Sequence, residues 1–352
     1  MEEPRPSSGA AEATTERIRY TKWSGAGNTF LLVTREGLPP EVEGAALARA
    51  LCGGAGAPGA DGLLLVRDRE AQFWNRDGSP AAFCGNSARC LAAHVLAHSG
   101  SARVQIRVGR VDVQGWRVGE EIAIRVPAPR YLARSLSAGE FLAELGPLAS
   151  RVEEMAWIEA GVPHLCLRLA GESAPGATGA GEGAGRRGDS GRADFSALAR
   201  AGAALRRHAR FGPEGTNVDF LWPATAKGPA SIPAAPLPGA WPAGGTVGPQ
   251  EPAGEGPVPG PPLPLEGRLE TFERGLEDLS PACGSGVLAA AFLLLEGHGA
   301  GWVRLHLASG ASLAVEKKGP AWTMLGPACP VARGTFLWTR ATAGESPSPP
   351  PG

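Results

Sequence analysis

Two short segments of the chain carry the same pattern, a Cys-Gly pair followed by small or polar residues and then by a run of apolar residues. The first pattern begins at Cys84 and leads into Leu91–Leu96, and the second begins at Cys283 and leads into Val287–Leu295. Both apolar runs lack a polar face, which is typical of helices that are buried on all sides. A chain with two such helices needs two shells of other elements to cover them.

The segments around these helices predict short strands, because they are runs of β-branched, aromatic and apolar residues bounded by turn-forming residues. At 352 residues the chain also exceeds the usual size of one hydrophobic core. We therefore expect an α+β protein of two similar halves, each with strands wrapped around a central helix. The predicted strands are Phe30–Val33, Leu63–Val66, Gln72–Trp74, Val104–Val108, Ile122–Val126, Ala156–Glu159, Leu165–Leu169, Asn217–Trp222, Gly267–Phe272, Trp302–Leu307, Ser312–Val315, Trp322–Leu325 and Thr335–Trp338.

Four segments have a composition that does not support a packed core. Residues 223–266 and 171–192 are rich in Pro and Gly, and they bury too little apolar surface to offset the entropy of ordering their backbone. We predict that both are disordered insertions and that the longer one forms an extended loop between two paired strands. The terminal segments 1–16 and 343–352 are expected to be disordered tails.

The charge balance and the N-terminal sequence argue against several classes of protein. The chain has 34 Lys and Arg residues against 35 Asp and Glu residues, and it has no basic stripe that could track nucleic acid. The N-terminus lacks the basic and apolar regions of a secretory signal, and the longest apolar run is far shorter than the roughly 20 residues that span a bilayer. We expect a soluble, cytoplasmic protein without membrane or nucleic-acid partners, in which the six cysteines stay reduced.

The predicted position of Cys84 and Cys283 at two helix starts has a chemical meaning. A helix N-terminus presents unpaired N–H groups and about half a positive charge, which lowers a thiol pKa from its free value of about 8.5. Two thiols facing one Cα atom can remove its proton on one face and deliver another on the opposite face, which inverts an amino acid without a cofactor. Amides at the two helix starts are expected to hold the substrate α-carboxylate, namely those of Gly85, Asn86, Gly284 and Ser285.

Other interpretations of the cysteines stay open at this level. A free cysteine is among the most often buried residue types, so either thiol alone is compatible with a structural role. Cys84, Cys90 and His94 lack the Cys-x-x-Cys spacing of a zinc site and have no evident fourth ligand, so no metal is expected. No lysine lies in a signal for a pyridoxal phosphate pocket, and no cofactor is expected. A thiol redox or metal-binding module is the non-enzymatic alternative.

Eight motifs in a fixed order resemble the diaminopimelate epimerase family. The resemblance covers almost the whole chain outside the predicted insertions and tails. It implies two pseudo-symmetric domains, residues 17–130 and 131–332, with the active site in the cleft between them and a final strand, at about 333–342, that returns to the first domain. It also implies a homodimer. The motifs are Trp23–Phe30, Gly59–Leu64, Asn75–Ser79, Cys84–Cys90, Gly161–His164, Glu214–Phe220, Phe272–Gly275 and Ala282–Gly286.

The resemblance implies an isomerase that interconverts LL-2,6-diaminopimelate and meso-2,6-diaminopimelate, a step of lysine and peptidoglycan precursor biosynthesis. Cys84 and Cys283 would be its two acid/base groups. Glu273 would accept a hydrogen bond from the substrate α-amino group near the second cysteine, and His164 would lie near the first. The distal amino-acid end of the substrate would be held by Asn28, Asn75, Asn217 and Arg274.

Several positions depart from the family pattern. Thr29 replaces an Asp, Ser87 and Ser285 replace Gly and Thr, and Val162 replaces an Asn that is common before Pro-His. Val162 lacks the amide that could hydrogen-bond the distal end of diaminopimelate. The alternative is therefore another two-cysteine racemase or epimerase, acting on proline, hydroxyproline or a different polar amino acid.

Overall fold

The computed structural model describes residues 14–40, 42–81, 83–171, 189–223, 265–297 and 300–340. Most of the segments predicted to be disordered (1–16, 171–192, 223–266 and 343–352) lie outside these residues. The prediction is wrong at their edges, because β1 begins at Thr14, α4 begins at Asp189, β11 runs to Pro223 and β12 begins at Leu265. Helical and ladder hydrogen bonds pair the backbone at these edges.

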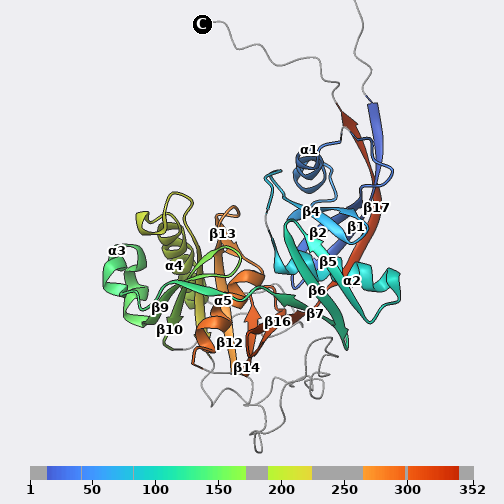
Figure 1. The fold of residues 1–352 in the computed structure, drawn as a ribbon. Coiled ribbons are helices and arrows are strands. Elements are labelled where there is room, and N and C mark those ends of the chain that lie inside the picture. The colour runs from blue at the N-terminus through green and yellow to red at the C-terminus, as the bar shows by residue number, and fades with distance from the viewer. Residues whose placement is uncertain are drawn as a thin grey trace, which may run out of the picture.

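The N-terminal lobe, blue to teal in Figure 1, folds its strands around helix α2. β1 pairs with β2 antiparallel, β2 with β3 parallel, β3 with β4 antiparallel and β4 with β5 parallel, and β5 to β7 form an antiparallel meander. The bounds of these strands are β1 (Thr14–Gly25), β2 (Asn28–Thr34), β3 (Gly62–Arg67), β4 (Glu70–Asn75), β5 (Arg103–Val108), β6 (Val111–Val118) and β7 (Glu121–Val126).

The second lobe repeats this order of pairings around helix α5. β9 pairs with β10 antiparallel, β10 with β11 parallel, β11 with β12 antiparallel and β12 with β14 parallel, and β14 to β16 form an antiparallel meander. The two lobes are therefore pseudo-symmetric, and β2, β3 and α2 correspond to β10, β11 and α5. The bounds of the remaining strands are β8 (Arg130–Ala133), β9 (Val152–Glu159), β10 (Pro163–Leu169), β11 (Asn217–Pro223), β12 (Leu265–Glu273), β13 (Asp278–Ser280), β14 (Ala300–Leu307), β15 (Ser312–Lys318), β16 (Ala321–Gly326) and β17 (Cys329–Arg340).

The two central helices are buried as their apolar sequences predicted. Most residues of α2 (Gly85–Ser99) and of α5 (Gly284–Leu294) are screened from solvent, although the C-terminal turn of α2 is exposed. α2 stops at Gly100, whose φ of 65° lies in the left-handed region that glycine adopts without strain. No helix among the described residues is long and apolar enough to cross a membrane. The other helical segments are α1 (Gly44–Ala48), the π-turn Arg49–Gly53, the 3-10 turns Ala138–Phe141, Gly146–Arg151 and Ala209–Phe211, α3 (Leu142–Leu145) and α4 (Asp189–Arg206).

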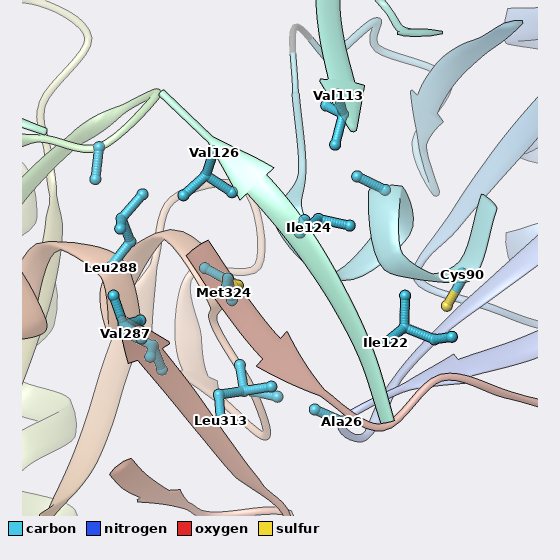
Figure 2. Packing of buried hydrophobic residues seen from close by; sticks show 14 of the residues in the cluster. Ala26, Cys90, Val113, Ile122, Ile124, Val126, Val287, Leu288, Leu313 and Met324 are labelled. Carbon is cyan, nitrogen blue, oxygen red and sulfur yellow. The ribbon is translucent and has the colours of Figure 1, made fainter. Parts of the chain in front are cut away.

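Backbone pairing and one shared core join the two lobes. β7 of the first lobe pairs with β16 of the second, and β17 then crosses to pair along β1, where both strands run side by side in Figure 1. Figure 2 shows β7, with Ile122 and Ile124, between side chains of the first lobe and residues of the second such as Val287 and Met324. Because this core is continuous, the packing of the lobes fixes where α2 and α5 begin relative to each other.

Candidate active site

Cys84 and Cys283 each stand immediately before a central helix. Both have extended backbone dihedrals, φ −144° and ψ 120° for Cys84 and φ −122° and ψ 105° for Cys283. Neither side chain makes a capping hydrogen bond to its own helix. The cysteines thus sit at the positively polarised ends of α2 and α5, in the position that the sequence pattern predicted.

The two helix starts lie against each other. A Cβ atom built on Gly284 would fall 2.8 Å from Oδ1 and 3.5 Å from the backbone nitrogen of Asn86. Only a glycine after Cys283 allows this approach, because any side chain there would push the first turn of α5 away from the first turn of α2. The residue that directly follows Cys283 therefore contacts the second residue after Cys84, and both helix N-termini converge on one region.

Burial dominates the acidity of both thiols. Cys283 is 4% exposed and Cys84 is half-buried. Burial raises the pKa of Cys84, and it raises the pKa of Cys283 well above its ordinary value; the Glu273 carboxylate adds to both effects. The amides at the helix starts do lower the pKa of both thiols, as expected, but they offset only part of the effect of desolvation.

Glu273 connects the two cysteines electrostatically. It ends strand β12, and its negative charge acts on both thiols. Burial raises the pKa of its own carboxyl group, while the Ser280 hydroxyl and His164 lower it. Glu273 is thus a partly buried carboxyl group whose charge acts on both thiols, whereas the resemblance assigned it only to the second.

The hydrogen bonds of His164 link it to Cys283, whereas the resemblance implied a place near Cys84. Its Nε2 is 2.9 Å from the Ser285 hydroxyl, which is 3.4 Å from the Cys283 sulfur. Its Nδ1 is 2.8 Å from Oδ2 of Asp219, and both the His164 and Asp219 side chains are fully buried. The reason is topological, because β10 carries His164 and packs against α5 within the second lobe.

Asn217 supports this cluster from within strand β11. Its Oδ1 accepts a hydrogen bond of 2.8 Å from the backbone N–H of Arg274, and its Nδ2 is 3.2 Å from His164 Nε2. Asn217 is 5% exposed. Both ends of its amide are engaged with the protein, so in this structure Asn217 positions His164 and Arg274.

A matching contact joins Asn28 and Asn86 in the first lobe. Asn86 Nδ2 donates to Asn28 Oδ1 at 2.6 Å, and Asn86 Oδ1 accepts from Nη2 of Arg89 at 2.8 Å. Arg89 is fully buried and forms no salt bridge among the described residues. Burial lowers its pKa to about 10. A guanidinium group thus lies one turn into α2, behind the residues that follow Cys84.

The two residues expected at the distal end of the substrate are more exposed. Asn75 ends β4, and its Nδ2 donates to the Ser79 hydroxyl at 3.0 Å across a turn. The Arg274 side chain is 29% exposed and pairs at 3.3 Å with Glu214, whose side chain is 85% exposed. Neither residue is held in the buried cluster around the cysteines.

Three residues gain a place at the site that the sequence did not give them. They are Asp219, Arg89 and Glu214, which lie within the family-like motifs but received no role from the sequence. A signal was present for the first two, since each is a charged residue inside an otherwise buried strand or helix. Among the described residues, no group of three metal-ligating side chains converges.

Comparison with known proteins agrees with these motifs. A family model described as diaminopimelate epimerase matches residues 20–129. The chain is 30% identical over 304 residues to the diaminopimelate epimerase of Xanthomonas campestris pv. campestris, covering 81% of this chain and 84% of that protein.

Solved structures share the fold at much lower sequence identity. A phenazine biosynthesis protein of the PhzF family from Bacillus anthracis matches with a TM-score of 0.58 and 11% identity, over 92% of this chain and all of that chain (100%). A probable proline racemase from Agrobacterium radiobacter K84 matches with a TM-score of 0.51 and 14% identity, over 90% of this chain and 92% of the other. Sequence, motif order and fold together show that the chain belongs to the diaminopimelate epimerase family of isomerases.

Proposed function

We propose that this protein interconverts LL-2,6-diaminopimelate and meso-2,6-diaminopimelate, with Cys84 and Cys283 as the two acid/base groups. The observation that carries the proposal is the contact of two cysteine-led helix starts, in which Gly284 lies against Asn86. This geometry brings two thiols and two sets of first-turn amides to one small region. A substrate Cα atom held there would have one thiol on each face.

The chemistry follows from the charges around that region. The substrate α-carboxylate would bind the first-turn amides of α2 and α5, where the partial positive charge of both helices stabilises an anion. A thiolate on one face then takes the Cα proton while the thiol on the opposite face gives up its own proton. The same amides stabilise the negative charge that spreads onto the carboxylate as the C–H bond breaks.

Binding of the substrate to Glu273 would help to form the thiolate. Its carboxylate raises the pKa of both Cys84 and Cys283, and the substrate α-ammonium is the natural partner of that carboxylate. An ammonium bound to Glu273 would cancel its negative charge and thereby favour ionisation of a neighbouring thiol. The unliganded protein would keep both thiols protonated, and binding would form the reactive state.

The distal end of diaminopimelate fits the more exposed residues. Arg274 already pairs with Glu214, and replacing that exposed carboxylate by a substrate carboxylate costs little. The planar guanidinium group suits bidentate binding of a carboxylate. Asn75, whose amide now bridges to Ser79, would contribute from the first lobe.

Membership of the family supports the proposal that this reaction belongs to lysine and peptidoglycan precursor biosynthesis, takes place in the cytoplasm and is carried out by a homodimer. Light scattering of the purified protein would give its mass in solution directly. The proposal predicts twice the chain mass of 36.1 kDa, and a monomer with full activity would contradict it.

The proposed function is tested by offering the purified protein LL-diaminopimelate, proline and trans-4-hydroxyproline and separating the stereoisomers by chiral chromatography. Inversion of diaminopimelate alone is expected. Cys84→Ala and Cys283→Ala should each lower the rate about 10²- to 10⁴-fold, the usual contribution of a general acid or base. Cys329→Ala, which removes an exposed thiol on β17, is the matched control and should keep the rate.

Because of Val162, the same set of substrates also tests whether the protein acts on a smaller amino acid. It stands where the family commonly has an Asn, so a smaller amino acid without a second amino-acid end is the alternative substrate. Inversion of proline or hydroxyproline with no action on diaminopimelate would replace the proposed substrate and keep the two-thiol chemistry. Full activity in Cys283→Ala would refute that chemistry.

A further inference from the structure

The two cysteines differ in the hydrogen-bonded pair of residues that lies next to each of them. Because the lobes are pseudo-symmetric, Ser285 corresponds to Asn86, since each is the second residue after its cysteine. Each of them bonds to a residue near the start of the equivalent strand, Ser285 to His164 of β10 and Asn86 to Asn28 of β2. One pair is a hydroxyl and an imidazole, which exchange protons readily. The other is two carboxamides, which do not.

The tautomer of His164 follows from its neighbours. Because Asn217 Oδ1 accepts from the Arg274 N–H, its NH2 group faces His164 Nε2. Nε2 is therefore the unprotonated nitrogen of the neutral ring, and Nδ1–H donates to Asp219 at 2.8 Å. The Ser285 hydroxyl can then donate to Nε2 at 2.9 Å and accept from the Cys283 thiol at 3.4 Å.

Asp219 ends this series of hydrogen bonds and is held in place by several groups. Its carboxylate is fully buried and accepts from Thr271 Oγ1 at 2.7 Å and from the Cys166 thiol at 3.3 Å, in addition to His164. A Cβ atom on Gly286 would lie 2.6 Å from Asp219 Oδ1, so the first turn of α5 packs directly on the carboxylate. The equivalent strand of the first lobe, β3, is apolar along Leu63–Val66.

We propose that Ser285, His164 and Asp219 form a proton relay that serves Cys283 alone, while Cys84 exchanges its proton with solvent. The exposures agree, since Cys283 is 4% exposed and Cys84 is half-buried. A thiol that is cut off from water needs a neighbouring group that can take up its proton and return it. This inference rests on the proposed two-thiol reaction and assigns Asp219 and Ser285 as positioning residues.

The relay balances in both directions. When Cys283 must act as a base, its S–H proton passes to Ser285 Oγ, and the Ser285 hydroxyl proton passes to His164 Nε2. The products are a Cys283 thiolate, an intact Ser285 hydroxyl and an imidazolium held by the Asp219 carboxylate. The thiolate then takes the Cα proton, which leaves a Cys283 thiol beside the imidazolium. In a turnover of the opposite direction this thiol gives its proton to the substrate carbanion, and the same two transfers then run in reverse, which restores the thiol and returns the ring to its neutral form.

Ser285→Ala tests the relay, because it removes the bridging oxygen and leaves His164 and Asp219 in place. We expect kcat to fall roughly 10²-fold with little change in KM, and Ser285→Thr to return most of the loss. The solvent proton inventory of kcat should be curved in the wild-type protein and linear in Ser285→Ala. Ser312→Ala breaks a Ser–His hydrogen bond of 2.8 Å, to His306, elsewhere in the same lobe and should have no effect.

Two further measurements separate a relay from a structural role. Asp219→Asn should cost a similar factor, and the double variant Ser285→Ala/Asp219→Asn should cost no more than either single variant, since all three interrupt one route. Additive losses, or a raised KM as the main effect, would overturn the proposal. If Ser285→Ala does not fold, as judged by circular dichroism, Asp219→Asn carries the same kinetic tests.

A substrate-free assay keeps the relay distinct from the proposed function. The rates at which iodoacetamide modifies Cys283 and Cys84 can be read separately by peptide mass spectrometry. We expect Ser285→Ala to slow modification of Cys283 roughly tenfold and to leave Cys84 unchanged. Unchanged modification of Cys283 would overturn the relay even if the protein is an active epimerase, whereas failure of all amino acids in the set of substrates would overturn the function and leave this assay valid.

Discussion

Arg89 is a buried positive charge without a carboxylate partner among the described residues. Its Nη2 bonds to Asn86 and its Nη1 lies 3.1 Å from the Met324 sulfur, while Nε has no hydrogen-bond partner among the described residues. Such a group is costly to bury, so a protein retains it where its charge has a use. The guanidinium lies behind the start of α2. There, in the proposed reaction, an anionic substrate group would bind and a thiolate would form.

We predict that Arg89→Met lowers kcat/KM roughly 10²-fold, the scale of removing one fixed donor from an anion site. The free energy of unfolding should fall by less than about 3 kcal/mol, since Asn86 loses a donor but the cost of burying a cation disappears. Kinetics and urea unfolding measure the two effects. Wild-type kcat/KM in a folded Arg89→Met protein would contradict this role.

The sequence was sufficient to select candidate residues for the site, but it did not predict the contacts that these residues make. Cys84 and Cys283 were recognised because the pattern around them repeats. The contacts of His164 were not predicted, because its contact with Ser285 spans 121 residues and its contact with Asp219 spans 55. Contacts across such separations depend on strand order, which no local pattern states.

Among the elements, α2 is enclosed by its sheet with little free space. Gly115 is buried in the middle of β6, where a Cβ atom would lie 2.7 Å from the Cβ of Ala92 on α2. Two small residues therefore let the helix approach the strand closely. This contact positions α2, and with it Cys84, against the sheet of the first lobe.

Gly115→Ala should lower the free energy of unfolding by about 1–3 kcal/mol, the usual cost of overpacking a core. Gly53→Ala is the matched control, because Gly53 is exposed and a Cβ atom there would lie no closer than 3.5 Å to its nearest neighbours. That variant should stay within about 0.5 kcal/mol of wild type. Equal stability of both variants in urea titrations would show that the close approach of β6 and α2 carries no strain.

The elements that the sequence missed have a common property. β1, β6, β8 and β13 lack a continuous apolar run, either because charged residues alternate along the strand, as in β1, or because a glycine interrupts it, as in β6. β1 exists because it pairs with β17, for example Ile18 with Phe336. Tertiary pairing supplies what local propensity does not.

At the scale of the whole molecule, a shared core makes one site from two lobes. The pairing of β7 with β16 and the common packing of Ile124, Val287 and Met324 hold α2 and α5 start to start. The repeat in the sequence predicted two similar halves, but it could not predict that their helices meet. That meeting depends on the β7–β16 pairing and on the contact of Gly284 with Asn86, which only the three-dimensional structure shows.

The most direct measurement is the position of deuterium after the first few per cent of turnover of LL-diaminopimelate in heavy water. If two opposed thiols act on one carbon, the meso product carries one deuterium, delivered by the far thiol, and the unconverted LL substrate carries none. Deuterium appearing in the recovered LL substrate as fast as in the product would mean that one group serves both faces, which contradicts the pairing of Cys84 with Cys283.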